Sequence, residues 1–170
     1  KLSKSYDITR KTLFRGAVLS TTFHHKTKQK QFTVINTYLD ASNEQNWSLQ
    51  VSSLSSHNLK PNTMIIGDLN HAPDDVDRSG FHCDKSRAAR DLFQNMLTKH
   101  GLQEVYQTNH TWYGCREDRL SSSRIDRAYH NFDFVTIATH RPTLHTLTTI
   151  PHTVTTYGVS NSGSDWTDDS

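Results

Sequence analysis

A short apolar run at residues 63–67, Thr-Met-Ile-Ile-Gly, limits the possible folds of this chain more than any other segment. Apolar and polar residues do not alternate in it, which is typical of a strand buried on both faces. The run leads directly into Asp68-Leu69-Asn70. The sequence therefore predicts a central strand that ends in a carboxylate and a carboxamide. On an extended chain these two side chains point the same way and can jointly hold a water and a phosphate oxygen.

The rest of the chain shows a mixture of strand and helix patterns. Segments rich in β-branched and aromatic residues predict strands, and apolar residues close to helical spacing predict two helices. The predicted strands are 13–23, 31–38, 63–67, 102–106, 124–129 and 132–139, and the predicted helices are 43–59 and 85–100. We expect Ser42 or Asn43 to cap the first helix and Gly101 to end the second. This alternation indicates an α/β or α+β fold.

The composition excludes several classes of function. The net charge of the 170 residues is only +2, which is too small to predict nucleic-acid binding by bulk charge, so an anionic partner must be held by local clusters. No apolar stretch approaches the ~18 residues of a membrane span, so we expect no membrane partner. Two cysteines, Cys83 and Cys115, are too few for a disulfide scaffold or a four-cysteine metal site.

Four short segments contain residues suited to chemistry, and each has an ordinary structural alternative. Gly67-Asp68-Leu69-Asn70 is equally typical of a turn after a strand. Strand alternation places Arg124 and Asp126 on one face of the predicted strand and Arg127 on the other. An aspartate flanked by arginines is also consistent with a simple ion pair. Tyr38 ends a predicted strand, where tyrosine more often belongs to the core or its rim. Thr111-Trp112 lies in a loop-rich stretch. None of the four is specific by itself.

In their order along the chain, however, these segments resemble the endonuclease/exonuclease/phosphatase superfamily, which has the DNase I-like fold. Within it, the chain is most similar to the endonuclease domain of LINE-type non-LTR retrotransposons. The motifs that carry the resemblance are Tyr38, Gly67-Asp68-Leu69-Asn70, Asp77-Arg78-Ser79, Thr111-Trp112 and Ser123-Arg124-Ile125-Asp126. The agreement in order argues against a chance match.

The resemblance implies a fold, a cofactor and partners. The fold would be α/β, a DNase I-like β-sandwich flanked by helices (αββα). Residues 1–170 would form a single partial domain, comprising its central and C-terminal portion. The reaction would be phosphodiester hydrolysis assisted by Mg²⁺, or Mn²⁺. The expected partners are DNA and a reverse transcriptase domain of the same polyprotein, and the expected location is intracellular and nuclear.

The resemblance also implies a role for each matched residue. Among the catalytic residues, Asp68 would align or deprotonate the attacking water and Asn70 would hydrogen-bond the phosphate. Tyr38 would donate to a phosphate oxygen, and Asp126 would orient the family's catalytic histidine. The other implied roles are substrate binding for Arg78, Thr111, Ser123 and Arg124, and metal binding for Asp165. Of these, Arg78 would meet the DNA backbone, and Thr111 would support the site by hydrogen bonding.

The chain departs from the family pattern at both ends. Where the family has Ser-Asp-His, the best match is Ser164-Asp165-Trp166, and tryptophan cannot transfer a proton. The family's metal-binding Asn and Glu precede the segment that begins at Leu13, but residues 1–12 contain no glutamate and no apolar strand pattern. We therefore expect a fragment or degenerate copy with incomplete metal ligation.

Three alternatives remain open from the sequence. A phosphomonoesterase or phospholipid phosphodiesterase of the same fold would share the core motifs. A catalytically dead nucleic-acid-binding or non-functional remnant would share them without turnover. An unrelated α/β domain with chance motifs is the third, and the ordered set of matches argues against it.

Overall fold

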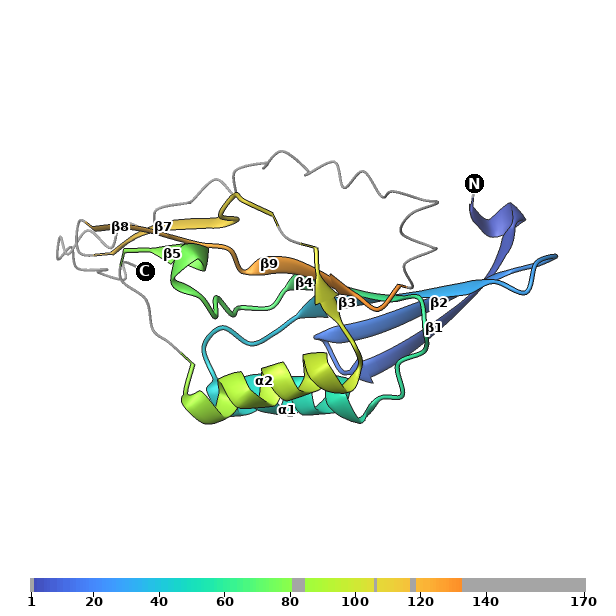
Figure 1. The fold of residues 1–170 in the computed structure, drawn as a ribbon, viewed down its shortest axis with the longest axis horizontal. Helices are drawn as coiled ribbons and strands as arrows, with labels where there is room; N and C mark the ends of the chain where they lie inside the picture. Colours follow the sequence, from blue (N-terminus) through green and yellow to red (C-terminus); the bar gives the residue numbers. More distant parts are fainter. Residues whose placement is uncertain (1, 81–84, 106, 117–118, 133–170) are drawn as a thin grey trace, which may run out of the picture.

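The computed structural model describes residues 2–80, 85–105, 107–116 and 119–132 of the chain (Figure 1). Its elements are, in order, η1 (Leu2–Lys4), β1 (Tyr6–Phe14), β2 (Val18–His25), β3 (Gln31–Tyr38), α1 (Glu44–Ser56), β4 (Thr63–Asp68), η2 (Asp75–Asp77), β5 (Arg78–Ser79), α2 (Arg87–Lys99), β6 (Gln103–Glu104), β7 (Trp112–Arg116), β8 (Arg119–Ser123) and β9 (Asp126–His130). No helix in the described ranges is long and apolar enough to cross a membrane.

The strands form two sheets. Six of them make sheet A in the order β1-β2-β3-β4-β9-β6, and three make sheet B in the order β5-β8-β7. The pair β3–β4 is parallel and the other pairs are antiparallel. A parallel pair needs a crossover connection, and α1 supplies it. Figure 1 shows α1 and α2 side by side against one face of sheet A.

The core lies between this face of sheet A and the two helices. Alternate residues of the central strands, among them Val18, Ile35 and Ile65, are buried against apolar residues of the helices. Trp47 of α1 is fully buried, and its indole Nε1 donates a hydrogen bond of 2.8 Å to the carbonyl of Leu69. Through this hydrogen bond, α1 fixes the backbone that follows the central strand β4.

Both predicted helices are present, each slightly shorter than expected. The side chain of Asn43 accepts a hydrogen bond from the backbone N–H of Asn46 and is the N-cap of α1, one of the two expected caps. Gly101 follows α2 with a φ of +58°, which is the left-handed conformation expected at a helix C-terminus. The central strand is also confirmed, as β4, and extends one residue further to Asp68.

The prediction for the first strand is wrong. Residues 13–23 do not form one strand, because the chain reverses at Gly16, which has a φ of +75°. The segment 6–14 is instead a complete strand that pairs with β2 from Tyr6–His25 to Phe14–Val18. Residues 1–12 show no apolar pattern because β1 is an edge strand with most of its side chains exposed. Such a strand is held by its backbone pairing.

Three other segments differ from the sequence prediction. The loop after Asn70 contains η2 and β5, and the loop-rich stretch at 110–113 leads into the β7–β8 hairpin. The strand expected at 102–106 is only two residues long, as β6. The strand expected at 132–139 lies outside the described residues after Phe132, as do Asp165 and Trp166.

Candidate functional site

Three neighbouring strands of sheet A bring predicted site residues into one row. In the parallel ladder, Tyr38 is the Cα partner of Asp68, and in the next ladder Asp68 is the partner of Asp126. Residues directly opposite each other on adjacent strands project from the same face of a sheet. The row lies where β3 and β4 end and β9 begins. Segments 30 and 58 residues apart therefore meet at one edge of sheet A.

Asn70 joins this row through a turn. The strand ends at Asp68, and Asn70 has a φ of +45°. The chain is therefore not extended from Asp68 to Asn70, in contrast to the expectation from the sequence. The backbone N–H of Asn70 donates to the Asp68 carboxylate at 2.9 Å. Its side-chain amide donates to the carbonyl of Leu39 at 2.7 Å. These two bonds fold Asn70 back beside the carboxylate.

Gly67 allows β3 and β4 to approach closely enough to form the row. Its φ is +140°, and a Cβ at this position would lie 2.0 Å from the carbonyl oxygen of Thr37. No side chain fits there without moving the backbone of β3. The glycine of the Gly-Asp-x-Asn motif is therefore a packing requirement.

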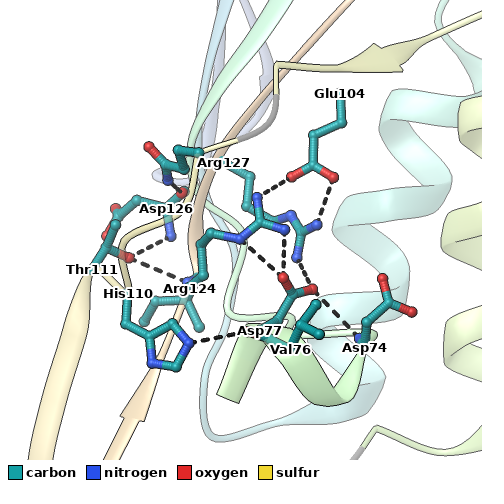
Figure 2. Close-up of polar contacts among 11 residues, drawn as sticks. Asp74, Val76, Asp77, Glu104, His110, Thr111, Arg124, Asp126 and Arg127 are labelled. Carbon is teal, nitrogen blue, oxygen red and sulfur yellow. Dashed lines mark hydrogen bonds and ion pairs between the residues drawn. The ribbon is translucent and has the colours of Figure 1, made fainter. Parts of the chain in front are cut away.

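Thr111, the residue before β7, supports the row. Its Oγ1 accepts hydrogen bonds from the backbone N–H groups of Ile125, at 3.2 Å, and Asp126, at 3.0 Å (Figure 2). The backbone N–H of Thr111 in turn donates to the carbonyl of Ser123 at 2.9 Å. Thr111 thus holds the start of β9 and agrees with the supporting role expected for it, while its contact with substrate stays a prediction.

Two arginines near Asp126 are bound inside the protein by two acids. Nε and Nη2 of Arg124 donate to Oδ1 of Asp77, the first at 2.9 Å, and Nη1 donates to Glu104 at 2.5 Å. Arg127 donates through Nη1 to Oδ2 of Asp77 at 2.6 Å and through Nη2 to Glu104 at 2.7 Å (Figure 2). We call Asp77, Glu104, Arg124 and Arg127 the charge cluster.

Three of the four members of the charge cluster, Asp77, Arg124 and Arg127, are buried, which changes the interpretation of Arg124. Asp77 is fully buried and Arg124 is 2% exposed. Burial raises the pKa of the Asp77 carboxyl, but hydrogen bonds from Arg127 and Arg124 outweigh it and hold that pKa below its usual value. The expectation from strand alternation that Arg127 faces away from Arg124 is wrong, because Arg124 precedes β9 and both reach the same acids. The burial of Arg124 favours a supporting role, and its contact with substrate stays a prediction.

His110 is a further polar residue of this region to which sequence reasoning gave no role of its own. Its Nε2 donates to the carbonyl of Val76 at 3.2 Å, and its Nδ1 lies 2.7 Å from the hydroxyl of Ser122. Because a carbonyl only accepts, the neutral ring accepts at Nδ1 from Ser122. The hydroxyl of Ser122 also contacts that of Ser79 at 2.7 Å. His110 therefore links η2 to sheet B.

The other predicted substrate contacts occupy different positions. Arg78 donates to Asp75 at 3.1 Å, and its side chain is largely buried. Ser123 is buried at the end of β8, opposite Arg78 in the ladder. Tyr38, in contrast, is 61% exposed. Of the residues expected to meet substrate, Tyr38 is therefore the most accessible to a large ligand.

The donors in the described ranges fit a metal ion only in part. Asp68 and Asp126 are adjacent carboxylates, and oxygen is the ligand type that Mg²⁺ prefers. Among residues the structure describes, however, no group of three His, Cys, Asp or Glu side chains could hold a metal ion. Asp165, the predicted metal ligand, lies outside them. Two carboxylates do not complete the six-ligand shell of Mg²⁺.

The fold and the ordered motifs define a class of protein. The sequence model of the Endonuclease/Exonuclease/phosphatase family matches residues 6–165. This match covers most of the chain, and the chain therefore belongs to that family. The DNase I-like fold inferred from the motifs is confirmed.

Solved structures that are similar to this chain share little sequence with it. The endonuclease domain of TRAS1, a telomere-specific non-LTR retrotransposon, has a TM-score of 0.56 at 14% identity, covering 74% of this chain and 56% of that one. The human Nocturnin catalytic domain with bound sulfate has a TM-score of 0.49 at 15% identity, covering 75% and 49%. A mannosyl-6-phosphatase of Bacteroides thetaiotaomicron has a TM-score of 0.41 at 17% identity, covering 75% and 53%. The chain thus spans about half the length of these structures. No curated protein matches it.

Proposed function

We propose that the domain containing this chain hydrolyses phosphodiester bonds. The observation that carries the proposal is the row of Tyr38, Asp68 and Asp126, with Asn70 folded against Asp68. At this edge of sheet A, two carboxylates and two neutral hydrogen-bonding groups can position a water against a phosphate. Membership of the family agrees with this chemistry.

The three residues of the row and Asn70 each have a distinct role in the proposed reaction. Asp68 accepts a hydrogen bond from the attacking water and so directs the lone pair of that water at phosphorus. Asn70, fixed through its bond to Leu39, contacts the phosphate or the water without adding charge. The exposed hydroxyl of Tyr38 donates to a phosphate oxygen. Asp126, whose backbone is held by Thr111, places a second carboxylate beside Asp68.

The cofactor of this proposal is Mg²⁺ or Mn²⁺. Such an ion, when bound, neutralises negative charge on the phosphate and the leaving oxygen. Asp68 and Asp126 are its possible ligands in the described part of the chain, and Asp165 is a further one by sequence. Since the described donors form an incomplete set, tight metal binding requires residues in addition to these two.

DNA is the proposed substrate, and a retrotransposon is the proposed setting. The support is the order of the motifs, including Asp77-Arg78-Ser79, together with the fold shared with the TRAS1 domain. A reverse transcriptase domain in the same polyprotein and a nuclear location belong to this proposal. A phosphomonoesterase or a phospholipid phosphodiesterase would use the same row on a different substrate.

The test is nicking of supercoiled plasmid DNA by the chain in the presence of Mg²⁺. We expect cleavage that chelation by EDTA abolishes and that Asp68→Ala reduces about 10³-fold or more, as for loss of a group that aligns the nucleophile. Asp91→Ala removes an exposed acid of α2 and serves as the matched control. Cleavage that persists in Asp68→Ala would refute the role of the row.

Binding of DNA without cleavage is a second candidate function. Ser164-Asp165-Trp166 favours it, because the tryptophan replaces the residue that would exchange a proton in the family pattern. The same plasmid assay separates the two functions when it is combined with a gel-shift measurement of affinity. Retained affinity with no nicking by the wild-type chain would support the binding function over hydrolysis.

A further inference from the structure

The charge cluster surrounds the segment that carries Asp126. Both of its arginines belong to residues 124–127, whereas its acids come from η2 and β6, which lie far away in the sequence. Arg124 lies two residues before Asp126 and Arg127 lies one residue after it (Figure 2). The two acids therefore bind the chain on both sides of the catalytic carboxylate.

Backbone hydrogen bonds fix the same segment. The N–H of Arg124 donates to the carbonyl of Asp77 at 2.8 Å, so Asp77 binds this residue through its main chain as well as its side chain. The carbonyl of Ile125 accepts from the N–H of Leu69 at 2.9 Å. Together with the two bonds to Thr111, these contacts connect the start of β9 to η2, to the turn after β4 and to the residue before β7.

We propose that Asp77 and Glu104 are positioning residues that hold Asp126 in register beside Asp68, and that Arg124 and Arg127 act only as their partners within the protein. The inference rests on the proposed hydrolytic function for its catalytic consequence. Its structural part, the fixing of residues 124–127, is independent of that function.

The geometry of the charge cluster explains why charged groups occupy this place. Each acid binds both arginines, and each planar guanidinium spans both acids, so the four side chains fix one another in direction as well as in distance. Two positive and two negative charges balance. Buried ion pairs contribute little net stability compared with apolar residues, so directional constraint is a better account of this arrangement than stability. A catalytic group displaced by about 1 Å can lose 10²-fold in rate.

Substrate binding by Arg124 is the competing explanation, and it predicts different kinetics. A guanidinium that contacts DNA contributes to affinity, so its loss raises KM or Kd. A guanidinium that positions Asp126 contributes to the chemical step, so its loss lowers kcat and leaves the Kd for DNA unchanged. The depth of Arg124, 2% exposed, favours the second.

The first experiment needs no activity. Amide hydrogen exchange is measured by NMR on the 170-residue chain, on Glu104→Gln and on Val51→Ala. Glu104 is the most accessible member of the charge cluster, so its neutral isostere is the variant best placed to fold. We expect exchange at the amides of Arg124, Ile125 and Asp126 to accelerate about tenfold beyond any change elsewhere. Val51→Ala, a core change in α1, should accelerate exchange evenly. Even acceleration in Glu104→Gln as well would overturn the proposal.

The second experiment measures catalysis with Glu104→Gln and Arg124→Lys at a temperature where both are folded. We expect kcat for plasmid nicking to fall about 10- to 100-fold. The Kd for DNA, measured in EDTA, should stay within about twofold. A raised Kd with unchanged kcat would assign Arg124 to the substrate and refute the proposal. If the wild-type chain does not cleave DNA, the hydrolytic function fails, and the exchange experiment alone decides whether the charge cluster fixes residues 124–127.

Discussion

At the scale of single residues, several positions in the site are explained by space and direction. Gly67 allows β3 and β4 to approach each other, and Thr111 accepts hydrogen bonds from the backbone at the start of β9. Asn70, in the left-handed conformation, turns back toward Asp68. The sequence marked all three as parts of motifs. It did not show that Gly67 is required for packing, because the obstacle is a carbonyl of another strand.

Gly67→Ala tests this packing requirement. The added methyl group would meet the carbonyl of Thr37, so we expect a loss of about 3 kcal/mol or more in the free energy of unfolding. Gly16→Ala is the matched control, since its φ is also positive but nothing lies within 4 Å of the added atom. The control should cost about 1 kcal/mol. Equal losses in urea denaturation would show that contact with Thr37 is unimportant.

His71, which follows Asn70, gives a prediction for pH. Burial, reinforced by the positive charge of Arg127, lowers the pKa of His71 from 6.5 to about 4. The unfolded chain therefore takes up a proton between pH 6.5 and 4 that the folded chain does not. The contribution of His71 to stability is full above pH 6.5 and falls by about 3 kcal/mol as the pH drops to 4.

The measurement for His71 is denaturant unfolding of the wild type and of His71→Phe at several pH values. Phenylalanine keeps the ring contacts with Trp47 and Phe93 but cannot be protonated. The difference in stability between the two proteins should shift in favour of the variant as the pH falls from 6.5 to 4. A difference that is constant with pH would contradict the lowered pKa.

At the scale of elements, the helices and strands that pack against the core could be predicted from the sequence. The exposed strands could not. The helices and β4 were found because burial against the core imposes a pattern on their residues. The strand β1 was missed because an exposed edge strand requires no apolar pattern. The hairpin of β7 and β8 was missed for a similar reason, since Tyr113 and Leu120 are exposed. Pairing between distant segments defines these strands, and a local pattern does not record it.

The start of α1 illustrates a local signal that can be read from sequence and tested. The side-chain oxygen of Asn43 accepts a hydrogen bond from the backbone N–H of Asn46, one of the donors that have no partner within the first turn of a helix. We expect Asn43→Ala to reduce the free energy of unfolding by about 1 kcal/mol. Asn95→Ala, on an exposed position inside α2, should leave stability within about 0.5 kcal/mol of the wild type or raise it slightly. If thermal unfolding gives the same loss for both variants, capping by Asn43 is unsupported.

At the scale of the whole molecule, the site depends on connections between the two sheets. The row of Tyr38, Asp68 and Asp126 belongs to sheet A. Its support comes from Asp77 of η2 and from His110 and Thr111, which lie just before β7 of sheet B. Motif order allowed the members of the row to be predicted from sequence. The charge cluster was not predicted, because Asp77 and Glu104 reach Arg124 only after the chain has folded.

The most direct test of the account measures whether Asp68 and Asp126 act as one unit. Plasmid nicking rates are compared for Asp68→Ala, Asp126→Ala and the double variant, each checked for folding by circular dichroism. Groups that work together in one step lose most of their effect when either is removed, so the double variant should be no more than about threefold slower than the slower single variant. Losses that multiply, or a single variant that cleaves at the wild-type rate, would contradict a shared site at this edge of sheet A.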